Sequence, residues 1–185
     1  MTNSSTMRVK SLTQTALAAA LIAVCAWITI PAAVSFTMQT FAVFTAVGLL
    51  GAKRGTLSVV LYIMLGALGL PVFSGFRGGA GVLVGNTGGY IVGFVFAALI
   101  SGLLISRFGH TIPALFFSMT AGLIVCYAFG SAWYYILYTK STGSIGILWI
   151  LSQCVFPFIP FDLAKIALAT FLVRRLRRIG GGWLL

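Results

Sequence analysis

Acidic side chains are almost absent from this sequence of 185 residues, in which Asp162 is the single Asp or Glu. Charged residues make up 7% of the chain, against about 25% in an ordinary soluble domain. So little charge excludes an ordinary soluble fold. Because 60% of the residues are hydrophobic, we predict an integral membrane protein.

Patterns for catalysis and metal binding are missing as well. One acid and one histidine, His110 in a basic loop, cannot form the paired groups of acid–base catalysis. The sequence also lacks HExxH, GxSxG and a Walker lysine. Cys25, Cys126 and Cys154 lie in apolar runs without a CxxC pair, as small buried hydrophobic residues do. We therefore expect no enzyme, no ATP hydrolysis, no metal site and no cofactor.

Basic residues give the chain a formal net charge of +11, which in a soluble protein would suggest a nucleic-acid partner. Here they stand in short loops between apolar runs, the pattern that sets orientation in a membrane. We expect no nucleic acid and both termini on the cytoplasmic side. The residues predicted to be cytoplasmic are Arg8, Lys10, Lys53, Arg54, Arg107, Arg174, Arg175, Arg177 and Arg178.

The apolar runs predict an all-α integral membrane protein, a compact bundle of six transmembrane helices, because about 20 residues make one crossing. We predict a single membrane domain, 1–185, with a cytoplasmic tail at 1–10, the bundle at 11–178 and a second tail at 179–185. The predicted spans are about 12–30, 41–50, 56–70, 88–106, 112–138 and 160–178. Residues 51–55 form a tight basic turn, and 145–156 form a short segment that is helical or partly re-entrant.

A glycine-rich outer connection, residues 75–90, links the third and fourth predicted spans. So much glycine argues against a plain helix and allows the backbone to approach a ligand closely, with N–H groups directed inward. It does not match a nucleotide-binding loop, because Val84 stands where the third glycine would be. A merely flexible loop is the alternative, although Phe76 and residues 82–84 are apolar for a solvated segment.

Asp162 lies in an apolar run, where an ionisable group costs about 2.5–3.5 kcal/mol and is by default functional. Lys165 follows three residues later, on the same helix face. The first turn of a helix also favours a negative charge. Two interpretations stay open: a binding site, or a pair that is only structural.

Other polar groups are expected on the same outer side as Asp162. They are the Arg77 guanidinium, the Asn86 and Gln39 amides and the Thr87 hydroxyl. With aromatic side chains and backbone N–H groups, this set suits a small amphipathic anion with a polar, uncharged head. Ion-coupled transport is disfavoured, because it usually employs more intramembrane acids and we detect no internal repeat.

Small residues mark one face of the first predicted span. Ala16, Ala19, Ala20 and Ala23 form two overlapping AxxxA spacings, which let another helix approach closely. That helix belongs either to this chain or to a second protein, and the spacing alone does not choose.

Five ordered motifs resemble the BioY family, the biotin-binding S components of energy-coupling-factor (ECF) transporters. They lie at residues 37–41, 50–55, 62–73, 87–94 and 160–165. Together they cover nearly the whole chain. The most specific are Thr-Gly-Gly-Tyr at 87–90 and the Asp-x-x-Lys of Asp162 and Lys165.

The resemblance implies a six-helix bundle in a bacterial cell membrane that captures biotin from outside. Uptake would be powered by a transmembrane coupling protein and two cytoplasmic ATPases, with Ala16 and Ala20 on the docking surface for the coupling protein. Asp162 and Lys165 correspond to binding residues, and the loop ending at Tyr90 closes over the ligand. Two alternatives are an S component for another small vitamin and a ligand-free membrane assembly subunit.

The resemblance also suggests roles within the site. Asp162, together with Asn86, would hydrogen-bond the ureido group of biotin. Lys165 would either orient Asp162 or donate to the ligand, and Arg77 with loop N–H groups would receive the valerate carboxylate. The family often has proline at Asn86 and glycine at Phe161, so the role of Asn86 depends on its chemistry and placement.

Overall fold

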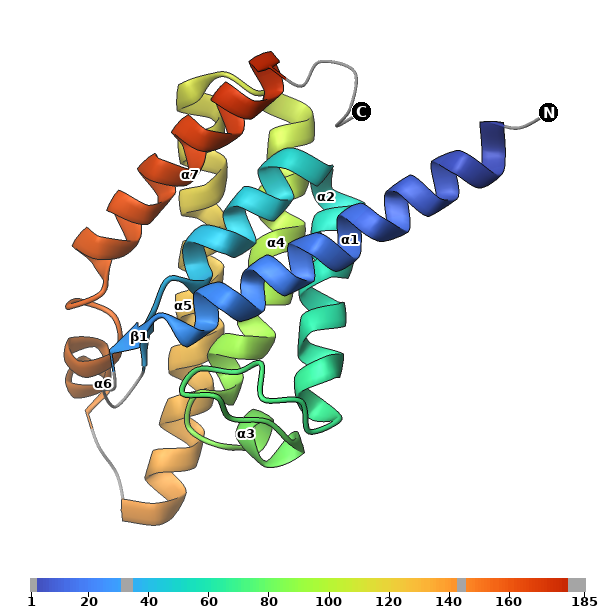
Figure 1. Ribbon diagram of the computed structural model, residues 1–185. Coiled ribbons are helices and arrows are strands. Elements are labelled where there is room, and N and C mark those ends of the chain that lie inside the picture. The colour runs from blue at the N-terminus through green and yellow to red at the C-terminus, as the bar shows by residue number, and fades with distance from the viewer. Residues whose placement is uncertain (1–2, 31–34, 143–145, 180–185) are drawn as a thin grey trace.

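The computed structural model describes residues 3–30, 35–142 and 146–179. Within these ranges the chain forms seven α-helices and one small antiparallel sheet, arranged as in Figure 1. The elements in order are α1 (Asn3–Trp27), β1 (Thr29–Ile30), β2 (Phe36–Thr37), α2 (Gln39–Ala67), α3 (Ala80–Val84), α4 (Gly88–Phe108), α5 (Ile112–Thr142), α6 (Ile147–Cys154) and α7 (Ile159–Ile179).

Several of these helices are long and apolar enough to cross a membrane. Among the described residues four qualify, in α1, α2, α4 and α5, and the bent pair α6 and α7 makes a fifth if counted as one span. The prediction of an all-helical, multi-pass membrane protein is therefore confirmed. The prediction of six helices is not, because the short helices α3 and α6 are added and two predicted spans are joined in α2.

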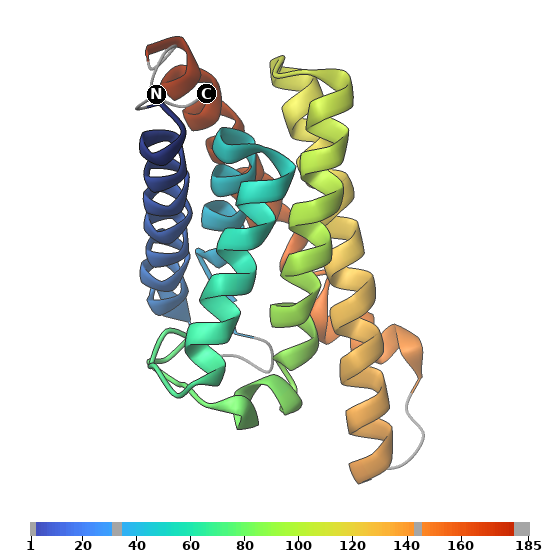
Figure 2. The same ribbon diagram turned by 90° about the vertical axis from the view of Figure 1, so that its right-hand side faces the viewer.

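The joined spans reverse direction inside α2. Gly51 has φ 79° and ψ 178°, a positive φ that glycine adopts without a steric penalty. Figures 1 and 2 both show the chain turning back there, so two arms of α2 lie side by side. A Cβ atom on Gly55 would lie 2.7 Å from the Cα atom of Val47. The reversal thus falls within the turn predicted at 51–55 but needs non-helical geometry only at Gly51.

One other predicted boundary was wrong. Helix α1 begins at Asn3 and not near residue 12, since no proline or glycine in the polar stretch before residue 12 interrupts a helix. The glycine-rich connection contains the short helix α3, whose five residues include one glycine. Most of the tail predicted at 179–185 lies outside the described residues, as do residues 1–2 and 143–145.

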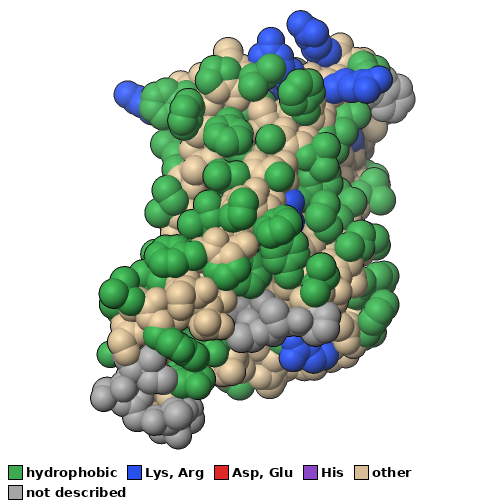
Figure 3. All heavy atoms as spheres, turned by 90° about the vertical axis from the view of Figure 1, so that its left-hand side faces the viewer, with side chains coloured by type: hydrophobic (Ala, Val, Ile, Leu, Met, Phe, Trp, Pro, Cys, Tyr) green, Lys and Arg blue, Asp and Glu red, His purple; other side chains and the backbone are tan. Residues whose placement is uncertain are grey.

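Charge is distributed unevenly between the two ends of the bundle. The start of α1 and the end of α7 lie at the end that carries the Gly51 reversal and the α4–α5 connection (Figure 1). On the face shown in Figure 3, most Lys and Arg side chains gather at this end, above a broad apolar belt. The opposite end carries α3 and α6. Helices α2, α4 and α7 all begin at a distance from the basic end, and the first arm of α2, α4 and α7 run toward it (Figure 1).

Small residues allow α4 to pack closely on both α2 and α5. A Cβ atom on Gly102 would lie 2.4 Å from the Cα atom of Ala52, and one on Gly122 would lie 2.0 Å from the Ser101 hydroxyl oxygen. Without a hydrophobic drive between helices in lipid, such close backbone contact is a main source of association.

Gly102→Ala should therefore destabilise the bundle by about 1–3 kcal/mol, the usual cost of overpacking, because the Ala52 backbone cannot move aside without separating α2 from α4. Thermal unfolding in detergent measures the effect. Gly81→Ala is the control, since a Cβ atom there meets nothing within 4 Å. The same melting temperature for the two variants would contradict this packing.

Candidate functional site

A pocket lies where the first residues of α2, α4 and α7 converge. Its lining residues are Ser35, Thr37, Gln39, Thr40, Ser74, Thr87, Tyr90, Ile91, Phe94, Leu123, Cys126, Tyr127, Cys154, Phe158, Asp162 and Lys165. Because each helix start carries a partial positive charge, the convergence of three of them favours a ligand with negative character.

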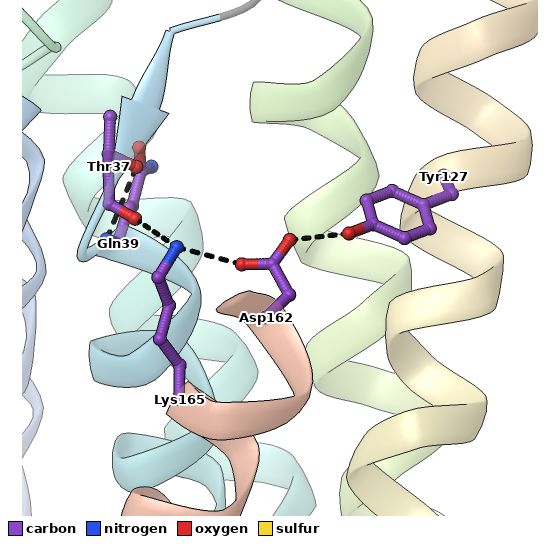
Figure 4. Close-up of polar contacts among 5 residues, drawn as sticks. All are labelled: Thr37, Gln39, Tyr127, Asp162 and Lys165. Atoms are coloured by element: carbon purple, nitrogen blue, oxygen red, sulfur yellow. Dashed lines mark hydrogen bonds and ion pairs between the residues drawn. The ribbon is translucent and has the colours of Figure 1, made fainter. Parts of the chain in front are cut away.

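An ion pair lies in the wall of this pocket. The Lys165 Nζ atom is 2.8 Å from Asp162 Oδ1 and donates a second hydrogen bond, 2.7 Å long, to the Thr37 carbonyl oxygen. The Tyr127 hydroxyl donates to Asp162 Oδ2 at 2.5 Å. Figure 4 shows this chain of contacts from the start of α2 to α5. Both ionised groups are almost fully buried, with exposures of 4% for Asp162 and 7% for Lys165.

An aromatic ring packs against the ammonium group of Lys165. Its Nζ atom lies 4.1 Å from the ring centroid of Phe36 in β2, within the range of a cation–π interaction. The same ring stacks on Phe158 at 5.4 Å and meets Phe161 edge to face at 4.9 Å. The connection between α1 and α2 is thereby attached to the start of α7.

Gln39 and Tyr90 present further polar groups to the pocket. Gln39 is 4% exposed, and its amide lies in the pocket wall and interacts with the Tyr62 side chain. Because a buried amide needs hydrogen-bond partners, this group is also suited to bind a ligand. The Tyr90 hydroxyl lies 3.1 Å from the Ser131 Oγ atom and is also positioned to donate to the Cys154 carbonyl oxygen, 3.5 Å away.

The glycines of the Thr-Gly-Gly-Tyr motif are required by close packing. A Cβ atom on Gly88 would lie 1.7 Å from the Leu83 carbonyl oxygen, and one on Gly89 would lie 2.2 Å from the Cβ atom of Trp133. The Trp133 indole also donates a 3.1 Å hydrogen bond to the Gly85 carbonyl. Helix α5 therefore holds the glycine-rich connection beside the pocket.

The structure brings most of the predicted site residues together, but not all. Asp162, Lys165, Gln39, Thr87 and Tyr90 line the pocket. Arg77 and Asn86 are exposed and are absent from its lining. The Arg77 Nε atom donates a 3.1 Å hydrogen bond to the carbonyl of Ser74, which does line the pocket.

The alanines of α1 divide into two sets. Ala19 and Ala23 are buried against the rest of the chain. Ala16 and Ala20 are exposed and border a surface groove together with Leu61 of α2. The first pair serves internal packing, and the second remains available to another helix.

Sequence reasoning missed Tyr127, Phe36, Phe158 and the Thr37 carbonyl. One signal was available for Tyr127, which stands in the middle of an apolar span. Tyrosines that anchor a helix at the membrane interface stand near its ends. No comparable signal identifies the Thr37 carbonyl, because every residue carries one.

The sequence model of the BioY family matches residues 1–181. The chain belongs to the BioY family. A biotin transporter BioY of Thermotoga maritima is 42% identical over 163 residues, which are 86% of this chain and 91% of that protein. A probable biotin transporter BioY of Pyrococcus horikoshii is 37% identical over 172 residues, covering 92% and 98% of the two chains.

A solved BioY-like structure has the same fold. The crystal structure at 2.1 Å of the S component for biotin from an ECF-type ABC transporter superposes with a TM-score of 0.84. The two chains are 30% identical, and the match covers 96% of this chain and 95% of the other. The family prediction is confirmed. These relatives are named as transporters and transporter components, in agreement with the expectation that the chain is not an enzyme.

Lys165→Met should destabilise the ligand-free protein by about 3–5 kcal/mol, the cost of leaving one partner of a buried ion pair unpaired. Asp162→Asn combined with Lys165→Met should recover most of this loss, because no buried charge then remains. Unfolding in detergent without biotin measures both. If the double variant is no more stable than Lys165→Met, the pair does not behave as a mutually neutralising unit.

Proposed function

We propose that this chain is the substrate-binding membrane subunit of an ECF-type transporter and captures biotin from outside the cell for ATP-driven uptake. The observation that carries the proposal is the buried Asp162–Lys165 pair in a pocket at the convergence of three helix starts. The names of the relatives and of the solved S component support biotin as the ligand.

The chemistry of the pocket fits the parts of biotin. A ureido group has two N–H donors and one strong acceptor, which match the Asp162 carboxylate and the donors of Lys165 and Gln39. The thiophane ring is apolar. Ile91, Phe94, Leu123 and Phe158 supply apolar surface for it.

The valerate carboxylate requires a cation or several N–H donors. We assign it to Arg77 together with N–H groups of the glycine-rich connection, because Arg77 is hydrogen-bonded to the backbone of a pocket-lining residue. Lys165 is the competing partner, although it is already engaged by Asp162 and Thr37. Asn86, exposed beside the pocket-lining Thr87, is assigned to the ureido group when the connection closes over the ligand.

We propose six crossings in the membrane: α1, the first arm of α2 with the segment before it, the second arm of α2, α4, α5, and α6 with α7 as one crossing bent by 47°. Helix α2 contributes to two crossings because it reverses at Gly51. The basic end then lies in the cytoplasm of a bacterial cell, with both termini. The whole chain, 1–185, is a single membrane domain. A transmembrane coupling protein docks at Ala16 and Ala20, and two cytoplasmic ATPases complete the transporter.

Asp162→Asn should weaken biotin binding about 30- to 100-fold, because hydrogen bonds to a charged group contribute about 1.5–3 kcal/mol. Isothermal titration in detergent measures affinity, and size-exclusion chromatography of the same sample gives the folded fraction, which should change far less. Unchanged affinity would refute the site. Mass spectrometry of the purified wild-type protein tests the ligand itself: another bound vitamin, or none, would favour the two alternative functions.

Arg77→Gln should weaken binding of biotin about two- to fivefold, as expected for a charge pair at an exposed rim, and leave binding of uncharged biotin amide unchanged. Arg107→Gln, which makes the same charge change at the other end of the bundle, should affect neither ligand. If Arg77→Gln weakens both ligands equally or neither, the carboxylate belongs to Lys165.

A further inference from the structure

A second pocket lies at the basic end of the molecule, far from the Asp162 site. It is lined by His110, Thr111, Arg174, Arg177 and Arg178, so the α4–α5 connection faces the last turns of α7. Arg177 is held in place there, because its Nε and Nη2 atoms donate to the carbonyl oxygens of Gly48 and Leu49 at 3.1 and 3.2 Å. The pocket is therefore lined by two parts of the fold, and a third, α2, fixes the position of Arg177.

No acidic side chain can neutralise this pocket. The sequence contains 12 Lys and Arg residues but one acid, and that acid is buried and paired with Lys165. Burial and the nearby Arg177 charge lower the pKa of His110, so at neutral pH the imidazole is an uncharged donor beside three guanidinium groups. The counter-charge for these groups has to come from another molecule.

An apolar groove adjoins the basic pocket. It is lined by Leu104, Phe108, Thr111, Pro113, Ala114, Phe117 and Ser118, so Thr111 belongs to both. Phe108 and Phe117 are 63% and 70% exposed. A basic pocket that shares a residue with an apolar groove, at the end of a membrane helix bundle, is complementary to a molecule with an anionic head and a hydrocarbon tail.

We propose that this pocket binds the phosphate of an anionic phospholipid from the cytoplasmic leaflet, with an acyl chain along the groove between α4 and α5. Arg174 and Arg178 supply charge and, in contrast to lysines, planar donor sets that match phosphate oxygens. Arg177, whose Nε and Nη2 atoms donate to α2, adds charge. The proposal is independent of the ligand bound at Asp162. It rests on the arrangement of the basic pocket and the groove.

Native mass spectrometry of the purified protein with phosphatidylglycerol or phosphatidylcholine tests the proposal. The wild type should retain phosphatidylglycerol preferentially. Arg174→Gln with Arg178→Gln should lower this retention about tenfold or more, because both charge-assisted contacts to the phosphate are lost. Arg8→Gln with Lys10→Gln removes the same charge from α1 at the same end and should change retention less than about twofold.

Two further measurements distinguish the lipid from other sources of charge. Ala114→Phe fills the groove without altering charge and should weaken phosphatidylglycerol retention, whereas soluble glycerol phosphate should not displace the lipid. Thermal unfolding verifies that each variant is folded.

Several outcomes would overturn the proposal. These are equal retention of the two lipids, equal losses in the two charge variants, displacement by glycerol phosphate, or unchanged retention when Arg174 and Arg178 are replaced. If that last variant instead loses association with purified transporter partners, the arginines serve a protein interface.

Discussion

Burial of one ion pair is the constraint on which the pocket depends. Asp162 and Lys165 lie almost without solvent in a protein surrounded by lipid, where an isolated charge would be expensive. Tyr127 from α5 donates to Asp162, and Lys165 donates to the Thr37 carbonyl before α2. The pair thereby joins three segments that are far apart in sequence, and the pocket exists where they meet.

Glycine and alanine make the surrounding geometry possible. The reversal at Gly51 places two arms of α2 side by side, and Gly102 and Gly122 let α4 approach its neighbours. Gly88 lets the start of α4 approach α3, and Gly89 lets it approach α5. In lipid, the van der Waals packing of these contacts stabilises the association of the helices, as hydrophobic burial does in water. The rigid bundle then holds the polar groups of the pocket in position.

The sequence predicts those features whose residue types are rare or costly in a membrane. Asp162 and Lys165 were found because charge is scarce, and the α2 reversal because glycine and basic residues cluster at 51–55. Arg77 and Asn86 were assigned to the site because they belong to the glycine-rich connection. The direction of a side chain in such a segment, however, depends on individual φ angles. Phe76, Gly75 and Gly79 all have positive φ there. Tyr127 was missed because a tyrosine in the middle of an apolar helix also resembles an ordinary packed aromatic residue.

The shortness of the first arm of α2 determines how deep the pocket lies. Residues 39–50 rise about 18 Å at 1.5 Å per residue, whereas the hydrocarbon core of a bilayer is about 30 Å thick. Measured from the basic end, where the reversal lies, Gln39 at the pocket is still within the thickness of the bilayer. A ligand that reaches Asp162 therefore leaves bulk water before it is bound, and the protein must replace its hydration shell with side chains and helix ends.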